Sequence, residues 1–102
     1  MSTFVFLGYF EQELYTWSAQ SINFIAKPIY GKKPCPVNFD AILPANAEVD
    51  TFYWQFGDGG TSDAMYPGHV YNSTGLFDVS LFVTYSDQKT DSIIKKKYIQ
   101  IE

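Results

Sequence analysis

The stretch from residue 76 to residue 85 alternates apolar and polar side chains almost without interruption. Phe77, Val79, Leu81 and Val83 occupy one set of alternate positions, and most of the residues between them are polar. Because successive side chains of a β-strand point to opposite faces, this pattern predicts a strand with one buried face and one wet face. Such a strand must be buried against a second layer, so the pattern predicts a packed β-structure.

The rest of the chain from about residue 21 divides into similar short runs separated by Gly, Pro, Asn and Asp. The aromatic content of 19% also favours an all-β fold. We expect a turn at residues 28–34 and irregular structure at residues 61–72. In the last run, from residue 90 to residue 101, we expect Ile99 and Ile101 to point inward and the lysines to face water. The inward residues of the other runs are predicted to be Ile22, Phe24 and Ala26, then Val37, Phe39 and Ala41, and then Phe52, Trp54 and Phe56, with Tyr53 and Gln55 facing the other way.

Length and charge exclude several classes of protein. The 102 residues have the usual size of one domain, and the single cysteine, Cys35, has no partner for an internal disulfide. A net charge of −4 does not provide the positive surface that nucleic acids require, so we expect no nucleic acid partner. We also expect no membrane insertion, because no apolar run approaches about 20 residues. Residues 1–10 lack the features of a secretion signal.

A second pattern combines a glycine-rich turn with residues on both sides of it. The chain contains Trp-Gln-Phe-Gly-Asp-Gly at residues 54–59, Pro-x-His-x-Tyr at residues 67–71, and then a glycine before the alternating strand. In its order and spacing this pattern resembles the PKD (polycystic kidney disease) domain, over roughly residues 21–101. The resemblance is carried by Trp54, Phe56, Gly57, Asp58, Gly59, Pro67, His69, Tyr71, Gly75, Val79 and Leu81. Gln55 and Phe77 depart from the family pattern, which commonly has Asp and Tyr at these two positions.

The resemblance implies an immunoglobulin-like antiparallel β-sandwich of about seven strands. Residues 21–102 would form this domain, and residues 1–20 would be an N-terminal extension. It also implies structural roles for the signature residues. Trp54 would fill the space between the two sheets, and His69 would pack where the loop meets a strand.

The sequence gives little support for a catalytic or a metal-binding site. His69 is the only histidine, and no Ser, Cys or second His stands in a matching motif position, so we expect no catalytic site. Asp58, Asp63, Asp87 and Asp91 flank glycine-rich or turn sequences and could supply oxygen ligands to calcium. Their spacing matches no calcium-loop template, and Asp is common in turns, so we expect neither a metal nor a cofactor.

Aromatic residues in the N-terminal extension lie outside the predicted sandwich core. Two interpretations remain open for them. They could form extra strands that cover a sheet edge, or they could form a docking arm that is buried in a neighbouring subunit. Phe82, on the outer face of its strand, is a further apolar contact candidate. The candidate interaction residues of the extension are Phe4, Phe6, Tyr9, Phe10, Tyr15 and Trp17.

Two non-enzymatic functions fit these observations. In the favoured hypothesis the chain is a small assembly protein displayed on a larger multimeric body, such as a phage capsid decoration or accessory virion protein. It starts at Met1, ends one residue after the last predicted strand and has no export signal. The alternative is an interaction or spacer module from a secreted or cell-surface protein or enzyme. Both hypotheses predict protein partners and a virion-surface or extracellular location, and the outer face could also contact glycans.

Overall fold

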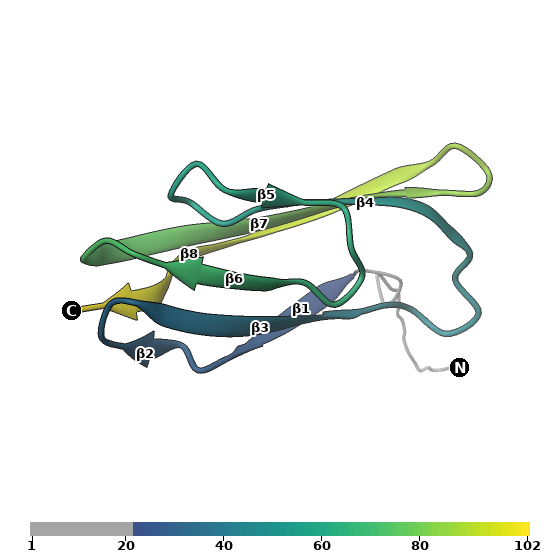
Figure 1. Ribbon diagram of the computed structural model, residues 1–102. Helices are drawn as coiled ribbons and strands as arrows, with labels where there is room; N and C mark the ends of the chain where they lie inside the picture. Colours follow the sequence, from purple (N-terminus) through teal and green to yellow (C-terminus); the bar gives the residue numbers. More distant parts are fainter. Residues whose placement is uncertain (1–21) are drawn as a thin grey trace, which may run out of the picture.

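The computed structural model describes residues 22–102, and every regular element in this part of the chain is a β-strand (Figure 1). No helix in this range is long and apolar enough to cross a membrane. The strands are β1 (Asn23–Lys27), β2 (Tyr30–Gly31), β3 (Cys35–Ile42), β4 (Val49–Gln55), β5 (Thr61–Ser62), β6 (Gly68–Tyr71), β7 (Gly75–Tyr85) and β8 (Thr90–Ile101).

The strands form two sheets that face each other (Figure 1). One sheet has the order β1-β3-β6, and the other has the order β2-β8-β7-β4-β5. This arrangement confirms the predicted all-β sandwich. The described residues contain eight strands where about seven were predicted, and two of these strands, β2 and β5, have only two residues each. All pairings are antiparallel except that of β2 with β8, which is parallel.

Trp54 lies at the centre of the core between the two sheets. Its side chain is fully buried, and its ring packs against Phe24 and Phe39, with ring centroids 5.2 Å and 5.5 Å away. The indole Nε1 donates a hydrogen bond to the carbonyl oxygen of Ala64 at 2.7 Å. Trp54 therefore joins both sheets and also anchors the loop that follows β5.

Two of the local predictions are wrong. Residues 61–72, expected to be irregular, contain β5 and β6, and the expected turn at residues 28–34 contains β2. These strands are short and their hydrogen-bond partners are distant in sequence. β6 pairs with β3, and β2 pairs with β8 through Tyr30 opposite Gln100. A two- to four-residue strand shows no periodicity, so only the long-range pairing defines it.

The prediction that the lysines of the last strand face water is wrong for Lys95. Lys95 lies opposite Val79, at an inward-facing position of β8. Its Nζ donates a hydrogen bond to the carbonyl oxygen of Phe24 at 2.6 Å and lies 4.9 Å and 4.8 Å from the ring centroids of Phe24 and Tyr98. The cation–π attraction and the hydrogen bond offset the free-energy cost of removing the ammonium group from water. Lys95 thus bridges β8 and β1.

An irregularity in β8 separates Lys95 from the next inward residue, Ile99. Between the pairs Val79–Lys95 and Phe77–Ile99 the register shifts, so that three residues of β8 lie opposite the single residue Asp78. Lys97 has a positive φ of 51° at this bulge, and its backbone N–H donates to Asp78 Oδ1 at 2.7 Å. The bulge adds two residues to β8 and so leaves its alternation unchanged, and Ile99 points inward as Lys95 does and pairs with Phe77.

Candidate functional site

The glycine turn after β4 packs directly against the backbone of β7. Gly57 and Gly59 have φ values of 90° and 97°, which side chains of L-residues rarely adopt. A Cβ atom on Gly57 would lie 2.4 Å from the carbonyl oxygen of Asp78, whereas one on Gly59 would meet nothing within 4 Å. The turn closes when the Phe56 N–H donates to the carbonyl oxygen of Gly60 at 3.0 Å. Asp58 is thereby placed at its tip.

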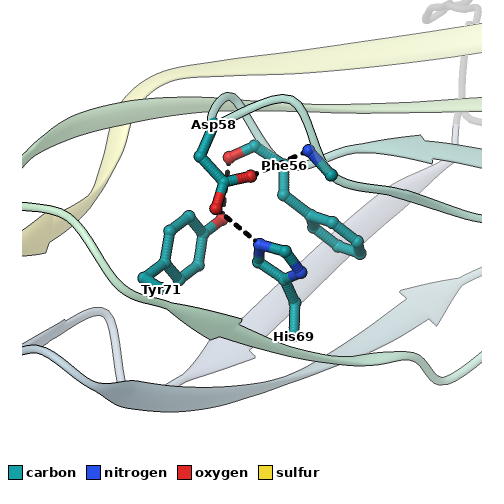
Figure 2. Close-up of polar contacts among 5 residues, drawn as sticks. Phe56, Asp58, His69 and Tyr71 are labelled. Carbon is teal, nitrogen blue, oxygen red and sulfur yellow. Dashed lines mark hydrogen bonds and ion pairs between the residues drawn. The ribbon is translucent and has the colours of Figure 1, made fainter.

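Asp58 contacts His69 of β6 across the space between the turn and the opposite sheet (Figure 2). Asp58 Oδ2 lies 2.7 Å from His69 Nε2, and Asp58 Oδ1 accepts the backbone N–H of Gly60 at 3.0 Å. The imidazole is stacked on the ring of Phe56, with centroids 4.3 Å apart and planes inclined by 14°. Both polar side chains are mostly shielded, with 19% of each exposed.

Two opposing effects act on the carboxyl group of Asp58. Partial burial, the largest single effect, raises its pKa. The hydrogen bonds from His69 and from the Gly60 N–H, together with the charge of His69, lower the pKa by more in total, so that the net pKa lies below the ordinary value. Asp58 is therefore an ionised hydrogen-bond acceptor at neutral pH.

Tyr71 completes this cluster from the other end of β6. Its Oη donates a hydrogen bond to the carbonyl oxygen of Phe56 at 2.8 Å, and its ring meets that of His69 edge to face, with centroids 4.8 Å apart (Figure 2). Burial, and secondarily the negative charge of Asp58, raise the pKa of the Tyr71 hydroxyl above its usual range. The hydroxyl therefore remains a neutral donor.

The cluster is suited to structural work rather than to catalysis. An Asp–His pair can act as the acid–base part of a nucleophilic site only if a nucleophile lies within hydrogen-bond reach of the imidazole. The described side-chain contacts of His69 are made with Asp58, Phe56 and Tyr71. Asp58 also accepts the Gly60 N–H, and Tyr71 also donates to the Phe56 carbonyl and packs against Phe77 of β7. Asp58, His69 and Tyr71 thus join the turn after β4 to the other sheet.

The remaining signature residues lie in the core or at strand boundaries. Pro67 is buried just before β6, and its carbonyl oxygen accepts the Phe39 N–H at 2.9 Å. Gly75 begins β7, and both Val79 and Leu81 are fully buried in that strand. The structure therefore brings all of the signature residues into one body that spans the two sheets.

The aspartates considered as calcium ligands do not come together in the described residues. No group of three His, Cys, Asp or Glu side chains in residues 22–102 is arranged to hold a metal ion. Asp58, Asp87 and Asp91 instead each accept a nearby backbone N–H, from Gly60, Lys89 and Ser92. Such local bonds are the usual role of Asp at turns and strand ends.

The structure places the predicted contact residue Phe82 on the outer face of the five-stranded sheet, 37% exposed. It lies opposite Tyr53 of β4, which is 45% exposed, and near Ile94 of β8, which is 52% exposed. The sequence reasoning identified Tyr53 as outward-facing but did not select it, and it missed Ile94. The other candidate residues, Phe4, Phe6, Tyr9, Phe10, Tyr15 and Trp17, lie outside the described residues.

Proteins with related sequences include bacterial collagenases. A microbial collagenase of Vibrio alginolyticus is 44% identical over 45 residues, which are 44% of this chain and 6% of that protein. Collagenase ColA of Clostridium perfringens is 34% identical over 62 residues, which are 59% of this chain and 6% of that protein. This chain therefore spans only about a twentieth of the length of these relatives.

Solved structures share the fold at low sequence identity. The PKD1 domain of the Vibrio cholerae metalloprotease PrtV has a TM-score of 0.66 at 22% identity, over 80% of this chain and 95% of that one. A structure from a study of promiscuous carbohydrate-binding modules of the β-sandwich superfamily has a TM-score of 0.69 at 21% identity, over 79% of this chain and 33% of that one.

These structural likenesses show the fold alone, and the match to a family model shows the family. The model for the PKD domain matches residues 21–101, which is most of the chain and includes both the glycine turn and the Asp58–His69 pair. This chain therefore belongs to the PKD domain family.

Proposed function

We propose that this PKD domain is a non-catalytic accessory module of a larger protein that acts outside the cell, where it holds its carrier against a polymeric substrate. The comparisons favour this function over that of a phage capsid decoration. The relatives named above are collagenases and a metalloprotease, and the matched segment is only a small part of each collagenase. Collagen is an extracellular polymer, which supports an extracellular location.

The Asp58–His69 pair is the single observation that carries the non-catalytic part of the proposal. It contains the polar groups that most resemble catalytic machinery, and Asp58 in this pair accepts the Gly60 N–H and contacts His69 Nε2. Tyr71 is likewise occupied by the Phe56 carbonyl. Asp58, His69 and Tyr71 thus hold the turn after β4 in place. The module must therefore act through other side chains on its surface.

The polymer could be a protein or a glycan, and each has a supporting comparison. The collagenase relatives favour a fibrous protein substrate, and the likeness to carbohydrate-binding modules favours a polysaccharide. In either case one module binds weakly, and the carrier gains affinity when several contacts act together.

Co-sedimentation tests the proposal. The purified chain is mixed with insoluble collagen, with cellulose and with chitin, and the bound fraction is measured together with any soluble peptide or sugar released. We expect saturable binding to at least one polymer without release of product. A domain of unrelated fold and similar net charge is the control. Failure to bind any of the polymers, or release of product by the chain alone, would contradict the proposal.

The role of residues 1–20 remains a separate proposal with the same two alternatives. If the segment is a docking arm, a variant that lacks residues 1–20 should stay folded but lose attachment to its partner. If the segment adds strands to the sandwich, the same deletion should lower the free energy of unfolding. Urea denaturation and analytical ultracentrifugation of the two forms separate these outcomes.

A further inference from the structure

Nine side chains form the centre of the outer face of the five-stranded sheet, and all nine are uncharged. The register places them in three rows across β4, β7 and β8, and the side chains that alternate with them point into the core. Charged residues make up 18% of the chain and are common on wet sheet faces, so an uncharged block of this size marks a special surface. We call it the outer-sheet platform. Its members are Thr51, Tyr53 and Gln55, then Ser80, Phe82 and Thr84, and then Thr90, Ser92 and Ile94.

Two aromatic rings stand at the middle of the platform. Tyr53 and Phe82 are directly opposite each other on β4 and β7, with ring centroids 6.2 Å apart and planes inclined by 38°. Both rings keep a large exposed fraction, as does Ile94 on the next strand. Ser80 also points outward but is only 8% exposed, because larger neighbours surround it. The platform therefore has two exposed aromatic rings at its centre and polar side chains beside them.

Two shallow depressions border the platform. One, of about 440 Å³, runs along β7 and β8 and is lined by Phe82, Val83, Thr84, Thr90, Asp91 and Ser92. The other, of about 270 Å³, lies where Gln55 meets Thr61 and the glycine turn. A ligand that covered the rings and reached both depressions would be elongated.

The nearest charges at the turn end of the platform cancel each other. Asp78 is the next outward residue of β7 beyond Ser80, and its Oδ2 lies 3.9 Å from Lys96 Nζ. This exposed pair leaves little net field at that end of the platform. At the other end Asp91 lines the depression along β7 and β8, and its carboxylate accepts the N–H groups of Ile22 and Ser92. The nine platform side chains therefore carry no charge that would attract an acidic or a basic polymer, and they suit a neutral one.

We propose that the outer-sheet platform binds a neutral polysaccharide chain, an inference that rests on the accessory role proposed above. A sugar ring presents C–H groups on its faces and hydroxyl groups around its edge. The C–H groups match the negative faces of the Tyr53 and Phe82 rings. The hydroxyl groups can donate to and accept from the hydroxyl and amide side chains around the rings, among them Gln55, Thr84 and Ser92.

A protein partner fits this surface less well. Protein interfaces of standard size bury about 800 Å² on each side and are centred on aromatic or Arg anchors inserted into pockets. The platform has only two aromatic rings and shallow depressions, and most of its other side chains carry polar groups. A protein that covered them with apolar side chains would leave those groups without hydrogen bonds, whereas a polysaccharide supplies a hydroxyl group to each of them.

Affinity electrophoresis with two related soluble polymers tests the proposal. Hydroxyethylcellulose is neutral and carboxymethylcellulose is anionic, although both have the same glucan backbone; glucomannan is a second neutral probe. We expect a neutral polymer in the gel to retard the chain, with little change when the salt concentration rises from about 0.05 to 0.5 M. Phe82→Ala and Tyr53→Ala should each weaken retardation by about tenfold.

Matched variants separate loss of the ligand contact from loss of the fold. Tyr66→Ala removes an aromatic ring that is 63% exposed and lies outside the platform, so its retardation should equal that of the parent chain. Ser92→Glu removes no packed side chain and places a charge opposite Phe82, so it should also abolish retardation. Circular dichroism of each variant establishes that it is folded.

The outcomes distinguish this inference from the function on which it rests. Retardation by a neutral polymer that Phe82→Ala and Ser92→Glu leave unchanged overturns the platform as the binding surface. If no neutral polysaccharide binds but collagen co-sediments with the chain, the accessory role stands and the ligand class is wrong. If neither kind of polymer binds, both proposals fail.

Discussion

Gly57 and Gly59 provide a matched test of how closely the glycine turn is packed. Both residues have positive φ, so an alanine at either position meets a similar backbone penalty. They differ in their surroundings, because only at Gly57 would the new Cβ collide with the backbone of β7. The difference in unfolding free energy between Gly57→Ala and Gly59→Ala therefore isolates the packing of the turn against the sheet.

The magnitudes follow from the geometry. An alanine at φ values of 90° to 97° costs about 1–2 kcal/mol, which should be the whole effect at Gly59. At Gly57 the Cβ would lie 2.4 Å from the carbonyl oxygen of Asp78, so β7 or the turn must move. Such overpacking adds about 1–3 kcal/mol. We therefore expect Gly57→Ala to cost about 2–5 kcal/mol in total.

Urea denaturation followed by far-ultraviolet circular dichroism measures both variants with the same probe. The slope of the unfolding free energy against urea concentration is compared as well, because a change in this slope would reveal an effect on the unfolded state. If the two variants lose the same free energy within about 0.5 kcal/mol, the turn is not packed against β7 as described, and the steric reasoning is refuted.

Three further predictions concern the core and the Asp58 cluster. Trp54→Ala should lower the free energy of unfolding by about 3–5 kcal/mol in urea denaturation, because it opens a cavity between the sheets; a loss below about 1 kcal/mol would contradict its central position. Tyr71→Phe should cost about 1–3 kcal/mol in the same assay, because the buried Phe56 carbonyl loses its donor, and an unchanged midpoint would exclude that hydrogen bond. The pKa of Asp58 is lowered by folding, so its stabilisation is complete above the unfolded value of 3.8 and is lost as the pH falls through the lower folded value. The difference in stability between the parent chain and Asp58→Asn should therefore shrink on acidification below about pH 4, and a difference that grows there would refute the sign.

The longest strands could be predicted from the sequence because their pattern is local. The alternation of Phe77, Val79, Leu81 and Val83 identified β7, and the runs that became β3 and β4 were placed within a few residues. The position of Trp54 between the sheets followed from the family resemblance. For the strands a short run of alternating residues sufficed, and no knowledge of the partner strand was needed.

The parts that the sequence did not predict depend on pairing between distant segments. β6 has only four residues, too few to show a period, and it exists because its backbone pairs with β3. Lys95 belongs to a run of three lysines, and only the register of β8 shows that it points inward. A charged residue at such a position requires partners, and Phe24, whose carbonyl and ring contact Lys95, lies far from it in the sequence.

The candidate sites show the same limit. The turn at Asp58 was evident from its glycines, but its contact with His69 joins the turn after β4 of one sheet to β6 of the other. The outward direction of Tyr53 and Phe82 followed from alternation, whereas their position opposite each other required the register of β4 with β7. Faces of single strands can therefore be predicted, but surfaces that combine several strands cannot.

Lys95 also limits how this domain can associate with copies of itself. Within residues 22–102, β8 has a partner on its β2 side only at Gln100 and Ile101, so most of that side remains a sheet edge. A strand from a neighbouring molecule added there would have to fit around the bulge at Lys97 and disturb the ammonium group of Lys95. Inward charges and bulges are the features that make an edge a poor template for strand addition. We therefore expect neighbouring copies of the domain, even when crowded together, not to pair their strands through this edge of β8.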